Sequence, residues 1–211
     1  MSSLRHPFGW ISGVFLILAV MRFLPFLDLP FKGAYPALWL FLSMAKDRCR
    51  ILSSAFLLCA LGDVMGIMGH FPLQVGSFAL SQMLFIFLFV RNSIGRPIRK
   101  ARIIAVLLLW MVMLPVVSLV IARAGGLFLA SLVLAYVLLL LSMASCAILL
   151  SRWTGMAGAL LFVLSDTMIG IRNFVMPFPF SAEAIMGTYY AALLLLCFWF
   201  FTKSRPRDAV W

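Results

Sequence analysis

Long apolar runs constrain the fold of this chain more than any other feature. Pro, Gly and clustered charges divide the sequence into eight such runs. A transmembrane helix needs about 20 mainly apolar residues, and a helix satisfies its own backbone hydrogen bonds inside lipid. We therefore predict spans at residues 9–27, 33–45, 50–69, 72–90, 102–121, 127–150, 153–173 and 182–202. The second run is short for a full crossing, so it is tilted, thins the bilayer or starts earlier, at about Leu29.

The composition leaves no room for a soluble domain beside these spans. Of the 211 residues, 65% are hydrophobic and 11% are charged, whereas soluble folds have about 25% charged residues. The fold class predicted is an all-α polytopic bundle of about eight helices, in which residues 1–211 form a single integral membrane domain. No small-x-small cleavage site follows the first apolar run, so we expect the first helix to stay attached.

The basic residues predict the orientation of the bundle. The net charge is +11, and the positive-inside bias of loops explains it without a nucleic-acid partner. With eight spans both termini share one side, which carries thirteen of the 17 Lys and Arg residues. The other side has the remaining four, Arg22, Lys32, Arg123 and Arg172. We therefore predict a multi-pass protein of the cell (inner) membrane with both termini in the cytoplasm.

Two aspartates inside predicted spans are the strongest candidates for catalytic residues. A carboxylate at mid-helix costs about 2.5 to 3.5 kcal/mol on insertion scales, and only Asp63 and Asp166 are in that position. Both helices run outward, so the two residues should lie at similar depth in one polar pocket. Two carboxyl groups in such a pocket do not both ionise easily, which leaves one acid beside one base near neutral pH. The structural alternative is that both only hydrogen-bond to neighbouring helices as packing contacts.

Other polar residues reach the same zone and are candidates for substrate binding. Gln82 is at the middle of the fourth span, and Arg22 lies deep in the first span as a counter-charge for one aspartate or as a residue that extends to the outer interface. Tyr189 and Thr167 also belong to this zone. The predicted substrate-binding set is Gln82, Arg22, Ser165, Tyr136, Tyr190 and Asn173. Two His and four Cys without a CxxC or HExxH motif predict neither a metal site nor a cofactor.

The two aspartates also belong to an internal similarity. Leu61-Gly62-Asp63-Val64-Met65 aligns with Leu164-Ser165-Asp166-Thr167-Met168, and each Asp is followed eight residues later by Phe, at Phe71 and Phe174. Four spans separate equivalent positions. A duplicated four-helix unit would give two repeats related by an axis along the membrane normal.

Three stretches of the sequence resemble the YhhN-type integral membrane proteins, which include the lysoplasmalogenases. They are Leu61-Gly62-Asp63-Val64, the Gly76–Gln82 stretch of the fourth span, and a Gly-Ala-x-x-Phe-x-x-Ser-Asp pattern that ends at Asp166. Tyr136 with Met143 is similar to the sixth-span pattern of the family, and the similarity covers most of the chain. The sequence departs from the family at Gln82, where a His is usual, and near Ala192, where a Gln is common.

The resemblance implies a hydrolase that cleaves the vinyl ether bond of lysoplasmalogens, with a lysophospholipid substrate taken from the bilayer. The products would be a fatty aldehyde and glycerophosphoethanolamine or glycerophosphocholine. The resemblance assigns the catalytic roles to Asp63 and Asp166. The residues themselves leave two alternatives open: a small proton-coupled transporter with the aspartates as a proton relay, and a non-enzymatic lipid-binding membrane protein.

The predicted orientation is tested by cysteine labelling. Residues 92–98 join two spans on the cytoplasmic side, so a cysteine at Ser93 should react with membrane-permeant maleimides only, whereas one at Asp28 should react from outside. Labelling of the Ser93→Cys protein by an impermeant reagent in intact cells would reverse the orientation.

Overall fold

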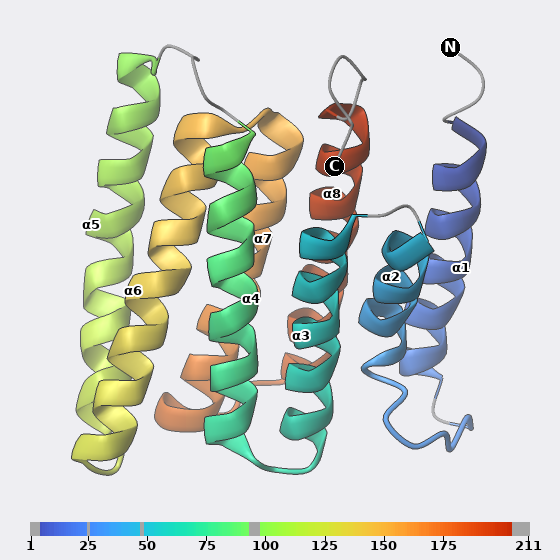
Figure 1. Ribbon diagram of the computed structural model, residues 1–211. Coiled ribbons are helices and arrows are strands. Elements are labelled where there is room, and N and C mark those ends of the chain that lie inside the picture. Colours follow the sequence, from blue (N-terminus) through green and yellow to red (C-terminus); the bar gives the residue numbers. More distant parts are fainter. Residues whose placement is uncertain (1–4, 25, 47–48, 93–97, 204–211) are drawn as a thin grey trace.

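The computed structural model describes residues 5–24, 26–46, 49–92 and 98–203, and within these ranges the chain is a bundle of eight α-helices (Figure 1). The elements are α1 (Arg5–Phe23), α2 (Tyr35–Lys46), α3 (Arg50–Ile67), α4 (Phe71–Arg91), α5 (Lys100–Arg123), α6 (Leu127–Leu150), α7 (Trp153–Gly170), the π-helical turn η1 (Ile171–Val175) and α8 (Ser181–Lys203).

Six of these helical segments are long and apolar enough to cross a membrane. They include the continuous segment Trp153–Val175, in which η1 extends α7. The all-α bundle that the apolar runs predict is therefore confirmed, and the bounds of most spans agree within a few residues. The π-helical end of the seventh span was not predicted.

The first two helices have other bounds than the sequence predicts. α1 ends at Phe23 instead of residue 27, and α2 begins at Tyr35, so an earlier start near Leu29 is wrong. The connection instead folds on itself, because Lys32 Nζ donates hydrogen bonds to the carbonyl oxygens of Leu24 at 3.0 Å and Leu27 at 2.7 Å. With 12 residues, α2 is about 18 Å long.

The helices pack mainly against their neighbours in the chain, and α4 against α6 joins the two halves. In Figure 1, α1 and α5 stand at opposite edges, and the first turn of α1 lies at the same end of the bundle as the last turn of α8. Neighbours occur in the same order in each half: α1–α2–α3–α4 and α5–α6–α7–α8. This order agrees with the predicted four-helix repeat, although the duplication itself stays a prediction.

Glycine allows α7 to approach α8 closely. A β-carbon built on Gly155 would lie 2.9 Å from the indole ring of Trp199 and 2.8 Å from Ser151 Oγ. Trp199 is 1% exposed and also stacks on Phe89, at 4.5 Å between ring centroids. In lipid, where apolar side chains gain little from leaving the solvent, close packing of this kind holds helices together.

We expect Gly155→Ala to destabilise the bundle by about 1 to 3 kcal/mol, because the added methyl group has no space. Gly187→Ala is the matched control, since nothing lies within 4 Å of a β-carbon there. Thermal unfolding of the purified proteins in detergent measures the difference. Equal melting temperatures for the two variants would contradict the close approach of α7 and α8.

Candidate active site

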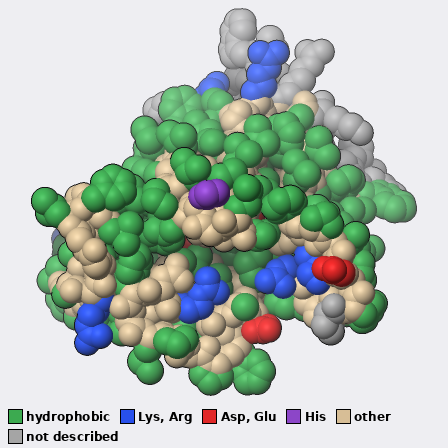
Figure 2. Space-filling model, turned by 90° about the horizontal axis from the view of Figure 1, so that it is seen from below, with side chains coloured by type: hydrophobic (Ala, Val, Ile, Leu, Met, Phe, Trp, Pro, Cys, Tyr) green, Lys and Arg blue, Asp and Glu red, His purple; other side chains and the backbone are tan. Residues whose placement is uncertain are grey.

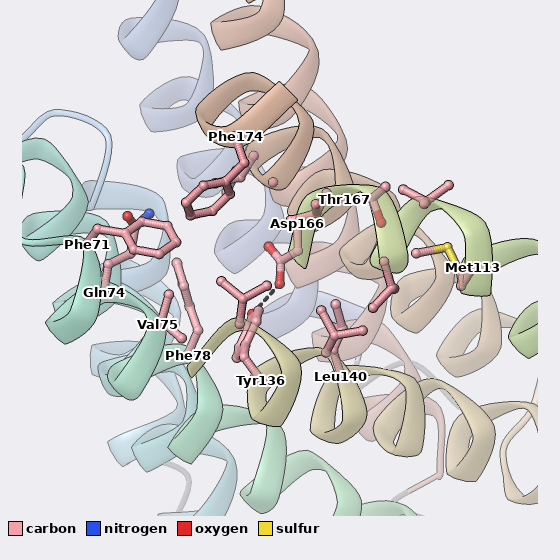
Figure 3. A pocket seen from close by; sticks show the side chains of 17 residues that line it. Phe71, Gln74, Val75, Phe78, Met113, Tyr136, Leu140, Asp166, Thr167 and Phe174 are labelled. Atoms are coloured by element: carbon pink, nitrogen blue, oxygen red, sulfur yellow. Dashed lines mark hydrogen bonds between the residues drawn. The ribbon is translucent and has the colours of Figure 1, made fainter. Parts of the chain in front are cut away.

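A pocket lies between α4, α5, α6 and α7, at the end of the bundle where η1 is found (Figure 3). It encloses about 650 Å³ of empty space, part of which opens to the outside of the protein. Most lining side chains are aliphatic or aromatic. They are Phe71, Gln74, Val75 and Phe78 of α4, Met113, Val116, Val117 and Val120 of α5, Val133, Tyr136, Val137 and Leu140 of α6, and Asp166, Thr167, Ile169, Gly170 and Phe174 of α7 and η1.

Asp166 carries the only carboxyl group in this lining, and its partner is a tyrosine. The Tyr136 hydroxyl group of α6 donates a short hydrogen bond to Asp166 Oδ2, drawn as the dashed line in Figure 3. Residues four apart lie on one face of a helix, so Gly170 continues the wall of the pocket one turn beyond Asp166. Thr167 also lines the pocket, but its hydroxyl group donates to the Val163 carbonyl oxygen at 2.7 Å.

Asp63 is bound in a similar way on the other side of an aromatic layer. The residue is 8% exposed, and the Tyr189 hydroxyl group of α8 donates to its Oδ2 atom at 3.0 Å. The Tyr189 ring packs edge-on against Phe78 and Phe162, with centroids 5.9 and 5.6 Å apart. Asp63 is absent from the pocket lining.

The two aspartates have equivalent places in their helices. Each lies four residues before the end of an 18-residue helix, α3 or α7. Their carboxyl groups are near enough to interact electrostatically. The equivalent phenylalanines eight residues further on, Phe71 and Phe174, contact each other edge-on with centroids 5.4 Å apart. Phe71 begins α4 whereas Phe174 lies in η1, so the two rings meet from different kinds of element.

Phe78 separates Asp63 from the pocket. Its ring lines the pocket and also covers Gly62, where a β-carbon would lie 2.9 Å from Phe78 Cε1. Gln74, one turn away on α4, covers Gly66 in the same manner, with Nε2 2.6 Å from the position of a β-carbon. Because Gly62 and Gly66 of α3 have no side chain, Phe78 and Gln74 of α4 pack directly on the α3 backbone.

Gln82 lies behind the pocket, beside Tyr136. It is 0% exposed, and neither its Nε2 nor its Oε1 atom has a hydrogen-bond partner of good geometry among the described residues. The neighbouring Ser81 is satisfied, because its hydroxyl group donates to the Ala55 carbonyl oxygen at 3.0 Å and lies 3.1 Å from Cys59 Sγ. Gln82 is thus a fully buried amide beside the Tyr136 hydroxyl group, without a hydrogen bond of good geometry among the described residues.

The other predicted substrate-binding residues lie outside the pocket lining. The Ser165 hydroxyl group donates to the Ile185 carbonyl oxygen at 3.0 Å, and the Tyr190 hydroxyl group to the Gly33 carbonyl oxygen at 2.8 Å. Both therefore connect helices or loops. Asn173 is exposed and accepts a hydrogen bond from Arg172 Nε at 3.4 Å.

Arg22 lies near the loop that carries Gly33. Its Nε atom would lie 3.6 Å from a β-carbon on Gly33, and it forms no salt bridge with Asp63, although the structure describes both residues. Figure 2 shows the end of the bundle to which Arg22 belongs, where a hollow near the middle has basic side chains on both sides.

Sequence reasoning did not single out several residues of the site. Tyr189, which belonged to the predicted polar zone but not to the substrate-binding set, is the partner of Asp63, and Gln74 lines the pocket. The sequence could have indicated Gln74, because it is a polar residue eight positions before Gln82. This spacing places both residues on about the same side of the helix. The segments that the structure describes contain no group of three or more His, Cys, Asp or Glu side chains that could hold a metal ion.

Gln82 gives a prediction about stability. Replacing it with Met, which has a similar shape and no amide, should raise the free energy of unfolding by about 1 kcal/mol, because a buried polar group without a partner is costly. Ser165→Ala is the control, since it removes a satisfied hydrogen bond and should lower stability by a similar amount. Thermal unfolding in detergent compares the variants, and a destabilised Gln82→Met protein would show that the amide has a partner.

Comparison with known proteins identifies the family. Residues 7–199 match the model of the YhhN family. Over 48 residues, the chain is 50% identical to lysoplasmalogenase TMEM86A of Bos taurus and 46% identical to lysoplasmalogenase TMEM86A of Homo sapiens. Each match covers 21% of this chain and 20% of the relative, and no solved structure matches. Because the family model spans most of its length, this chain belongs to the YhhN family.

Proposed function

We propose that this protein is a membrane hydrolase that cleaves the vinyl ether bond of lysoplasmalogens. The observation that carries the proposal is the position of Asp166, a carboxyl group with a tyrosine partner in the wall of a pocket that is otherwise mainly apolar. Membership of the YhhN family and the names of the partial-length relatives support it. The products are a fatty aldehyde and a glycerophospho-alcohol.

The chemistry needs an acid next to a hydrocarbon chain. A vinyl ether is cleaved when its alkene carbon distant from oxygen is protonated, which leaves an oxocarbenium ion. Water adds to this ion to form a hemiacetal, which collapses to the aldehyde and the alcohol. The carbon that takes the proton belongs to the hydrocarbon chain of the lipid. The acid therefore has to lie next to the part of the pocket that binds this hydrocarbon chain.

Asp166 fits the role of this acid. In its protonated form it delivers the proton to the alkene carbon, and as the resulting carboxylate it accepts a proton from the attacking water. One carboxyl group changes from acid to base in the same way in retaining glycosidases, whose transition state is also oxocarbenium-like. Tyr136 fixes the orientation of the group through its hydrogen bond to Oδ2.

Asp63 contributes to the same reaction by electrostatics. Its partner Tyr189 packs on Phe78, which lines the pocket, and an ionised Asp63 would stabilise the positive charge that develops on the oxocarbenium ion. Burial makes this effect larger, because few dipoles screen it. Tyr189 holds Asp63 in place on the side away from the pocket lining.

Aldehyde release from 1-alkenyl lysophosphatidylethanolamine and lysophosphatidylcholine by the purified protein in detergent tests the function. Asp166→Asn should lower the rate by about 10²-fold to 10⁴-fold, the usual contribution of a general acid, and Asp63→Asn should also lower it strongly. Asp28→Asn makes the same chemical change at an exposed position and should leave the rate unchanged.

Three controls make this experiment decisive. A lysolipid with a saturated ether bond should not react, and in D₂O the aldehyde should carry one deuterium on the carbon next to its carbonyl group. Thermal unfolding shows whether each variant is folded. Normal turnover by folded Asp166→Asn would remove Asp166 from the mechanism, and no aldehyde from the folded wild type would exclude the vinyl ether hydrolase.

A further inference from the structure

The side of the pocket formed by α5 and α6 consists of two matching aliphatic stripes. The side chains on each helix repeat at the spacing i, i+4, i+7, so each stripe stays on one face and extends for about 10 Å. The stripes are Met113, Val117 and Val120 on α5, and Val133, Val137 and Leu140 on α6.

The stripe on α5 lines the pocket, and it also packs against the rest of the bundle, because Met113 belongs to the hydrophobic core and Val120 lies near Gly170 of α7. α5 packs mainly on α6 and η1, and Trp110 Nε1 donates to Ser145 Oγ of α6 at 3.0 Å. Of its 24 residues only Met113 and Val120 are buried, and both line the pocket. The buried apolar side chains of α5 therefore form part of the pocket wall.

The stripes pass the proposed acid near their middle. Tyr136, which hydrogen-bonds Asp166, lies next to Val137 on α6. Figure 3 shows Asp166 between two different sides of the pocket, with the rings of Phe71, Phe78 and Phe174 on one side and Met113 on the other. The side chains near Asp166 are thus aromatic in one direction and aliphatic in the other.

We propose that the two stripes bind the hydrocarbon chain of the lipid substrate, with its first carbons at Asp166, and set the chain length that the enzyme prefers. This inference rests on the proposed function, because the reacting carbon of a vinyl ether lipid is the start of its chain. If the hydrocarbon chain of the lipid lies along the aliphatic side of the pocket, the glycerol end of the lipid lies on the aromatic side. Gln74 offers a polar group there.

Gly170 sets the width of this chain site at its outer end. A β-carbon there would lie 3.7 Å from both γ-carbons of Val120, an ordinary van der Waals contact. Gly170 thus leaves a slot between α7 and α5 that a larger side chain would fill. Gly170→Ala is compatible with the fold and reduces the slot without displacing a neighbour.

Rates with dodecenyl and octadecenyl lysophosphatidylcholine test the chain site. Val137→Phe fills the aliphatic side and should lower kcat/KM for the longer chain about tenfold relative to the shorter one, a typical effect of a changed apolar pocket. Gly170→Ala should also lower the ratio of kcat/KM for the longer chain to kcat/KM for the shorter chain, by a smaller factor. Leu138→Phe, which adds a ring at the adjacent, 45% exposed position, should leave the ratio unchanged.

A second measurement does not depend on turnover. A non-hydrolysable alkyl ether lysolipid with a diazirine near the end of its chain is photolysed with the wild-type protein, and the labelled peptides are mapped by mass spectrometry. We expect labels on Met113, Val117, Val137 or Leu140. Labels confined to other helices, or an unchanged chain-length ratio in active Val137→Phe protein, would overturn the chain site. Labels on these residues in a protein without hydrolase activity would instead overturn the proposed function alone.

Discussion

The cost of placing two carboxyl groups inside an apolar helix bundle organises the whole site. Such groups persist only with polar partners, and here each aspartate accepts a hydrogen bond from a tyrosine on another helix. The Tyr136 bond joins α6 to α7 within the second half of the chain. The Tyr189 bond joins α8 to α3 and so connects the two halves. The same contacts that make the aspartates tolerable also fix where their oxygens point. Stability and orientation of the reactive groups therefore have one origin.

Aromatic rings form the second component of the site. Phe78 packs edge-on against Phe162 and Tyr189, and it stands between the pocket and the helix that carries Asp63. Phe78 lines the pocket and covers Gly62, next to Asp63, whereas Asp63 itself is absent from the lining. This arrangement allows unequal roles, in which one carboxyl group reaches the pocket and the other acts only through its field.

Depth in the membrane could be predicted from the sequence, but rotation about each helix axis could not. Breaks at Pro, Gly and charge indicated where each span ends, and Asp63 and Asp166 do lie at equivalent positions, four residues before the ends of α3 and α7; their similar depth stays a prediction. The helices around them are apolar on all sides, so no amphipathic pattern showed which face turns inward. For that reason Tyr190 was preferred to Tyr189, and Ser165 was expected in the pocket although its hydroxyl group binds the α8 backbone. Their rotation depends on how side chains from distant parts of the chain fit together.

The conformation of the connection between α1 and α2 could not be predicted from the sequence either. An apolar run predicts a helix, but Lys32 instead holds this segment in turns by binding two carbonyl oxygens. No local pattern distinguishes a lysine that faces solvent from one that closes a loop.

The resulting short α2 has a mechanical consequence for the surrounding lipid. A helix of about 18 Å cannot match a hydrocarbon layer of about 30 Å, and Leu38 and Leu42 of this helix are exposed at the surface of the bundle. The bilayer has to become thinner beside α2 or let water approach its end. The lipid beside α2 therefore meets a helix of 12 residues, whereas the lipid beside α5, which stands at an edge of the bundle, meets a helix of 24 residues.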